Sequence, residues 1–209
     1  MGKIEISEYP IVTVILRGYS YEQNRAVVSQ LVGTKFNAVE IAMNTPGAPE
    51  IISRLVDEFG DDLLIGAGTV ISEKRAHEAA EAGARFVLSP ICFTPQIFEI
   101  CRANEMFCVP AACTPTEVWN MLEMGADIVK VYPASTLGPS YFQAIQAPLN
   151  PMPLMAVGGV NPGNYQSFFD GGATYVGIGN GIFAPEDIHA CNIEGIRASV
   201  ESFEQKVRW

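Results

Sequence analysis

Glu123-Met124-Gly125-Ala126-Asp127-Ile128-Val129 has a pattern that occurs three times in this chain. Glu81-Ala82-Gly83-Ala84-Arg85-Phe86-Val87 and Asp170-Gly171-Gly172-Ala173-Thr174-Tyr175-Val176 follow the same form. In each segment a helix is expected to end, a glycine can adopt the left-handed cap conformation, and an apolar strand follows. The chain therefore repeats a helix-to-strand unit, which is typical of α/β folds with a parallel sheet.

Short apolar strands alternate with amphipathic helical segments along the whole chain. Eight of each predict an α/β fold of the (β/α)8 TIM-barrel type, and we expect residues 1–209 to form a single domain. An open, doubly wound sheet is the alternative. It requires a glycine-rich turn after the first strand, and Leu16-Arg17-Gly18-Tyr19-Ser20 is not G-x-G-x-x-G.

The helix starts carry recognisable capping signals, because Ser72, Thr94 and Thr114 each stand just before a predicted helix. The predicted strands are Ile11–Leu16, Ala38–Ile41, Leu63–Ala67, Phe86–Leu88, Phe107–Val109, Ile128–Val131, Leu154–Val157 and Tyr175–Ile178, and the predicted helices are Tyr21–Val32, Pro49–Phe59, Ser72–Ala82, Pro95–Ala103, Pro115–Met124, Ser140–Ala147, Gly163–Asp170 and Pro185 to the C-terminus.

The overall composition excludes several classes of protein. Hydrophobic residues make up 48% of the 209 residues and charged residues 17%, a balance that is typical of globular proteins. The formal net charge of −10 argues against nucleic acid and anionic membranes as partners. No apolar run approaches the ~20 residues of a membrane helix, and the N-terminus lacks a signal-peptide pattern. We therefore expect a cytoplasmic protein with no membrane partner.

The cysteines and histidines give no metal-binding pattern. The five cysteines are odd in number and form no C-x-x-C pair, so we expect reduced, mostly buried thiols. The chain has only two histidines, His77 and His189, and neither has a neighbour typical of a zinc ligand. We expect no metal site.

Lys130 is the most unusual residue of the chain, because it lies inside the apolar run Ile128–Tyr132 that ends at Pro133. A lysine in a buried strand is costly unless it is paired or its amine is neutral. A neutral amine in a dry pocket is a nucleophile for carbonyl carbon atoms. The alternative is a structural lysine that pairs with a buried carboxylate, since such pairs also perturb lysines.

Glu40 is the second unusual residue, in the apolar run Ala38–Met43. It either neutralises Lys130 or Arg17, or acts as a general acid/base on a substrate that is bound to Lys130. In a barrel, catalytic groups stand at the C-terminal ends of the strands and in the loops that follow. Further polar residues and loop residues at such positions are Arg17, Asn44, Thr69, Ser89 and Pro90, and of these we expect Arg17, Thr69 and Pro90 to bind the substrate.

Two glycine-rich turns follow predicted strands 7 and 8. Gly158-Gly159 comes after the first of these strands, and Gly179-Asn180-Gly181 after the second. Loops at these positions commonly bind phosphate through backbone N–H groups, although they can also be simple tight turns. We expect Gly158, Gly159, Gly179 and Asn180 to bind phosphate, with Arg17 at the same mouth. The Thr69 hydroxyl could bind a carboxylate or a Schiff-base adduct.

The order and spacing of several motifs resemble the bacterial 2-keto-3-deoxy-6-phosphogluconate aldolase family over roughly Pro10 to Phe183. The motifs are Val39-Glu40-Ile41, Gly66-Ala67-Gly68-Thr69-Val70, Ser89-Pro90, Thr114-Pro115-Thr116-Glu117, Lys130-Val131-Tyr132-Pro133-Ala134-Ser135 and Ala156-Val157-Gly158-Gly159-Val160. The resemblance implies a class I aldolase on a (β/α)8 barrel, usually a homotrimer, with no metal or other cofactor. It places the Schiff-base lysine at Lys130 and the acid/base glutamate at Glu40.

The departures from that pattern indicate a branch of the family. This chain has Asn44 where the phosphogluconate branch usually has Arg, and Ala156-Val157 where that branch usually has Pro-Thr. These residues, together with Gly138-Pro139-x-Tyr141, resemble the 2-dehydro-3-deoxy-6-phosphogalactonate aldolase branch. Asn180 stands where both branches usually have Ser, and an Asn amide can still donate a hydrogen bond.

The resemblance thus implies a lyase that cleaves a phosphorylated 2-keto-3-deoxy sugar acid to pyruvate and glyceraldehyde 3-phosphate, with Arg17 and Thr69 completing the grip on the substrate. One alternative within the family is 2-keto-3-deoxy-6-phosphogluconate or 4-hydroxy-2-oxoglutarate as the substrate. A barrel that is an isomerase, epimerase or phosphate-ester synthase would keep the glycine loops but would not need Lys130 opposite Glu40. A non-catalytic barrel would bind the sugar phosphate without turnover.

Overall fold

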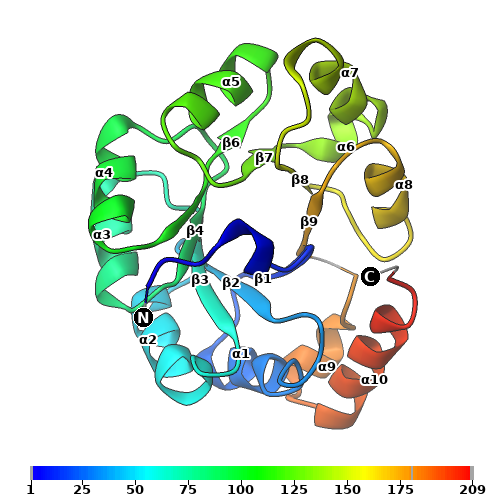
Figure 1. The fold of residues 1–209 in the computed structure, drawn as a ribbon. Coiled ribbons are helices and arrows are strands. Elements are labelled where there is room, and N and C mark those ends of the chain that lie inside the picture. The colour runs from blue at the N-terminus through cyan, green and yellow to red at the C-terminus, as the bar shows by residue number, and fades with distance from the viewer. Residues whose placement is uncertain (1, 180, 208–209) are drawn as a thin grey trace.

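The chain folds into a parallel barrel that is surrounded by helices (Figure 1). The computed structural model describes residues 2–179 and 181–207. Within these residues, nine strands are hydrogen-bonded in the order β5-β4-β3-β2-β1-β9-β8-β7-β6, and every registered pair is parallel. The strands are β1 Val12–Leu16, β2 Ala38–Ala42, β3 Leu64–Gly68, β4 Phe86–Leu88, β5 Phe107–Val109, β6 Ala111–Ala112, β7 Val129–Val131, β8 Leu154–Val157 and β9 Tyr175–Ile178.

The barrel closes where β5 and β6 follow each other along the chain. Only Pro110 separates them, and a proline has no N–H to donate to a ladder. β5 pairs with β4 on one side and β6 pairs with β7 on the other, so the two pieces occupy one position of the barrel. Nine strands therefore fill eight positions, and the prediction of a (β/α)8 barrel is confirmed.

Helices follow the strands and cover the outside of the barrel (Figure 1). Ser72, Thr94 and Thr114 act as N-caps, as predicted: each side chain accepts a hydrogen bond from a backbone N–H in the first turn of its helix. The helices are η1 Ile6–Glu8, α1 Tyr21–Val28, α2 Ala48–Phe59, α3 Glu73–Glu81, α4 Pro95–Ala103, α5 Pro115–Glu123, α6 Ala134–Leu137, α7 Ser140–Leu149, α8 Tyr165–Asp170, α9 Pro185–His189 and α10 Ile193–Glu204.

The prediction of one helix from Pro185 to the C-terminus was wrong. The segment forms two helices, because Cys191 has a φ of 50° and the side chain of Asn192 caps the start of α10. The short helices η1 and α6 were also not predicted. Each is shorter than two helical turns, so neither has the apolar periodicity on which the prediction depended.

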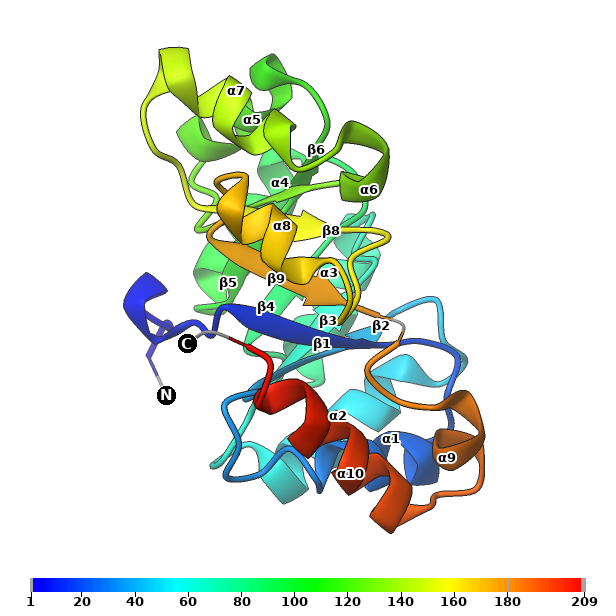
Figure 2. The same cartoon turned by 90° about the vertical axis from the view of Figure 1, so that its right-hand side faces the viewer.

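The hydrophobic residues form two layers. The larger cluster lies between the strands and the surrounding helices, and a smaller one fills the barrel interior. The N-terminal segment lies across the end of the barrel at which the strands begin (Figures 1 and 2). Its Tyr9 ring stacks on Phe107 at a centroid distance of 4.7 Å, and the Tyr9 hydroxyl bonds to Thr13. This segment covers the end of the barrel at which the strands begin, and the cavity described below lies at the opposite end.

Candidate active site

Lys130 and Glu40 point into the barrel because of the alternation of side chains along a strand. The neighbours of Lys130 in β7, Val129 and Val131, belong to the layer under the helices, and so do Val39 and Ile41 around Glu40 in β2. Since successive side chains of a strand face opposite sides, the residue between each pair faces the interior. Only 5% of Lys130 and 1% of Glu40 is exposed.

The surroundings of Lys130 favour a neutral amine. Burial lowers the pKa of Lys130, and the positive charge of Arg17 lowers it further, while the carboxylate of Glu40 opposes both effects. Among the described residues, the ion pairs do not include Lys130 with Glu40, so the two groups lack a direct salt bridge. An unpaired amine of this kind is available as a nucleophile at a lower pH than an ordinary lysine.

Glu40 is a buried carboxyl with one free oxygen. Burial raises its pKa, and the positive charges of Lys130 and Arg17 pull the pKa down again. Its Oε2 atom is buried without a hydrogen-bond partner, so it is free to accept a proton. Gly68 in β3 makes room for this side chain, because a Cβ atom at position 68 would lie within 2.1 Å of the carboxyl carbon. The glycine in the third strand is thus required by the glutamate in the second.

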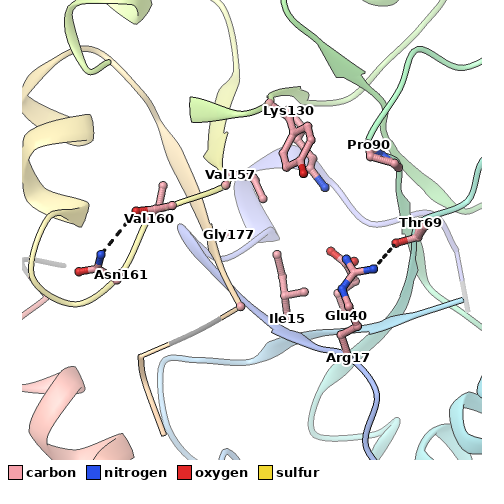
Figure 3. A pocket seen from close by; sticks show the side chains of 14 residues that line it. Ile15, Arg17, Glu40, Thr69, Pro90, Lys130, Val157, Val160, Asn161 and Gly177 are labelled. Atoms are coloured by element: carbon pink, nitrogen blue, oxygen red, sulfur yellow. Dashed lines mark hydrogen bonds between the residues drawn. The ribbon is translucent and has the colours of Figure 1, made fainter. Parts of the chain in front are cut away.

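Arg17, at the end of β1, turns its guanidinium group toward β2 and β3. Its Nη1 donates a hydrogen bond to Asn44 Oδ1 at 2.6 Å and another to Thr69 Oγ1 at 3.3 Å. Figure 3 shows the second bond, with the carboxylate of Glu40 beside the guanidinium. Thr69 itself has a φ of 57°, an uncommon conformation for a non-glycine residue. These residues form a polar wall that can bind a carboxylate.

Gly158 and Gly159 form a tight turn after β8. Both have positive φ values, of 94° and 75°. A Cβ atom on Gly159 would lie 2.2 Å from Ser135 Oγ, so the turn packs closely against helix α6, which follows β7. The side chain of Asn164 donates to the Gly159 carbonyl at 2.8 Å and fixes the turn. The bare backbone of this turn faces the same cavity as Lys130 and Glu40.

The cavity at this end of the barrel has a volume of about 600 Å³, enough for a small sugar acid. Figure 3 shows the amine of Lys130 pointing into it from one side, with Arg17 and Glu40 on the facing side. Its lining includes eight of the nine predicted site residues: Arg17, Glu40, Thr69, Pro90, Lys130, Gly158, Gly159 and Gly179. The ninth, Asn180, lies outside the described residues.

Residues 2–179 and 181–207 contain no group of three or more His, Cys, Asp or Glu side chains that could hold a metal ion. Within the same residues, no helix has the length and apolar character to cross a membrane.

The sequence and the structure both match known aldolases. Residues 3–199 match the family model for KDPG and KHG aldolase. The chain belongs to this family. It is 31% identical over 195 residues to 2-dehydro-3-deoxy-6-phosphogalactonate aldolase from Escherichia coli K12, which covers 93% of this chain and 95% of that protein.

Two solved structures have the same fold. A native KDPGal structure superposes with a TM-score of 0.81 and 29% identity, and the match covers 100% of each chain. KDPG aldolase from Legionella pneumophila, with pyruvate captured as a covalent carbinolamine intermediate, gives a TM-score of 0.85 and 26% identity over 95% of this chain and 96% of that one. The protein is therefore an aldolase, a lyase on a TIM barrel.

Sequence reasoning missed part of the lining of the aldolase cavity. Tyr132 directly follows β7, and position in the barrel could have identified it, since residues just beyond a strand face the mouth. Asn161 lies beyond the Gly158-Gly159 turn and gave no sequence signal. The other lining residues that were not predicted are Ile15, Val157, Val160 and Gly177.

Proposed function

We propose that this aldolase cleaves 2-dehydro-3-deoxy-6-phosphogalactonate to pyruvate and glyceraldehyde 3-phosphate through a Schiff base on Lys130. The observation that carries the proposal is a buried lysine with a lowered pKa and no direct ion pair, which shares one cavity with a buried carboxyl group. Such an amine is matched to attack on a keto acid. The carbinolamine in the Legionella relative supports the same chemistry here.

The reaction assigns a separate role to each of the two buried groups. The neutral Nζ of Lys130 attacks the C2 ketone, the C2–O bond breaks, and water leaves. The resulting iminium accepts the electron pair of the C3–C4 bond after Glu40 removes the proton from the C4 hydroxyl. Glyceraldehyde 3-phosphate leaves, and the enamine that remains is protonated at C3 and hydrolysed to pyruvate.

The two walls of the cavity suggest how the substrate lies. The N–H groups of the Gly158-Gly159 turn and of Gly179 would hold the phosphate, since their glycines allow a close approach. Arg17 and Thr69 are bonded to each other on the wall of β1 to β3, which fits the carboxylate end of the substrate better than the phosphate end. Lys130 and Glu40 then stand beside the carbons that react.

The choice between sugar epimers rests on the relatives and on the branch pattern, and it is tested directly with substrates. We expect faster pyruvate release from the galactonate-derived substrate than from the gluconate-derived one when both are assayed at equal concentrations. The measurement is kcat/KM for each in a coupled pyruvate assay. A preference for the gluconate-derived substrate would contradict the assignment to this branch, and turnover of neither would contradict the proposed substrate class.

We also propose that the protein is a cytoplasmic homotrimer. Three large apolar side chains are exposed in the segments that follow β3, β4 and β6: Ile71 after β3, Ile91 after β4, and Trp119 in α5 after β6. Exposed apolar surface of this kind is typical of subunit interfaces. Sedimentation velocity should therefore give a trimer for the wild type and a smaller species for Trp119→Glu. A monomeric wild type at micromolar concentration would contradict the trimer.

The five free thiols fit a reducing compartment, which cell fractionation can test.

A further inference from the structure

Tyr132 lies beside the amine that the proposed reaction uses. The Lys130 Nζ atom is 5.4 Å from the centroid of the Tyr132 ring and lies over the face of the ring. The ring is partly exposed and lines the same cavity as Lys130. Tyr132 comes directly after β7, and its backbone N–H donates to the Ala112 carbonyl at 3.2 Å, so its backbone is held by the barrel.

The turn after β8 supports the ring from the other side. A Cβ atom on Gly158 would lie 3.0 Å from two ring carbons of Tyr132, so the bare glycine lets the ring pack against the turn. The ring is thereby placed between the Gly158 backbone and Lys130. Within residues 2–179 and 181–207 the Tyr132 hydroxyl has no hydrogen-bond partner, so packing against the Gly158 turn positions the ring.

The groups around Nζ disfavour the positive charge that the Schiff base carries, and the ring face of Tyr132 can stabilise that charge. Burial and Arg17 both disfavour a positive charge on Nζ, while Glu40 is the charged group that favours it and is not in direct contact. This balance suits a neutral nucleophile but opposes the iminium that follows. Imine formation joins Nζ to C2, expels the ketone oxygen as water and consumes one proton, so a neutral amine becomes a cation at the same nitrogen.

We propose that Tyr132 is a further catalytic residue of this aldolase, whose ring face stabilises the cationic Schiff base on Lys130. The proposal rests on the proposed Schiff-base mechanism. A cation within about 6 Å of an aromatic centroid is attracted by the negative face of the ring. The neutral amine gains little from the ring and the iminium gains much more, so the interaction lowers the barrier instead of tightening substrate binding.

A series of fluorinated rings tests the proposal without changing the shape of the site. Tyr132→Phe is the reference, and 4-fluoro-, 3,5-difluoro- and 3,4,5-trifluorophenylalanine at position 132 then withdraw charge from the ring face step by step. The readouts are kcat and the rate at which borohydride traps a pyruvate adduct on Lys130. We expect both rates to fall steadily along the series, by about 2- to 30-fold in total, with a smaller change in KM.

The controls separate this proposal from the one on which it rests. The same fluorinated series at Tyr19, a half-buried ring that packs on His189 outside the cavity lining, should show no such trend. Equal rates along the Tyr132 series, with the adduct still formed, would overturn the role of Tyr132 alone. If the wild type forms no adduct with pyruvate, the Schiff-base mechanism itself is refuted. An equal decline along the Tyr19 series would also overturn the proposal, since the effect would not depend on proximity to Lys130.

Discussion

Lys130→Met should abolish both turnover and the borohydride-trapped pyruvate adduct. Methionine has a similar length and suits the apolar surroundings of β7, where 5% of the lysine is exposed. The fold should therefore survive while the nucleophile is lost. We expect kcat to fall by roughly 10⁵- to 10⁶-fold, the scale on which an enzyme loses activity when its covalent nucleophile is removed.

The measurements are a coupled pyruvate assay and the intact mass after reduction with borohydride. The matched control is Lys74→Met, at a lysine on the solvent face of α3 whose side chain is 84% exposed. The control should form the adduct as fast as the wild type. A reduced adduct on Lys130→Met protein would mean that another amine is the nucleophile, and the site assignment would fail.

The barrel could be predicted from the sequence because the signals that define its helices and strands lie within short segments of the chain. The three repeats around Gly83, Gly125 and Gly172 each end a helix and begin a buried strand, and all three glycines have positive φ values in the structure. The division of the fifth barrel strand into β5 and β6 at Pro110 could not be predicted in the same way. β5 pairs with β4 and β6 pairs with β7, and these pairings form only when the barrel closes.

In the candidate site, too, features that depend on local sequence could be predicted, and features that depend on contacts between distant segments could not. Lys130 and Glu40 could be predicted as candidates because a charged residue in an apolar strand conflicts with burial, and such conflicts are expected at functional positions. The bond between Arg17 and Asn44 gave no such signal, since the two residues follow different strands and meet only because β1 pairs with β2. The contact of Tyr132 with Lys130 is likewise a matter of side-chain direction, which no spacing rule supplies.

Glu40→Gln should separate imine formation from carbon–carbon cleavage. Glutamine keeps the shape that fits over Gly68 but cannot take a proton from the C4 hydroxyl. We expect kcat for the sugar acid to fall by about 10²- to 10⁴-fold, the usual worth of a general base. The pyruvate adduct on Lys130 should still form, because attack by the amine needs no base at the C4 position.

The pH dependence gives an independent check on this role. A general base must be ionised, and burial raises the pKa of Glu40 in the free enzyme, so wild-type kcat/KM should rise with pH through a value above that of an ordinary glutamate. Glu40→Gln should lose that rise, since its amide does not titrate in this range. Equal kcat values for both proteins would exclude Glu40 as the base. An adduct that disappears along with turnover would instead place Glu40 in the formation of the imine.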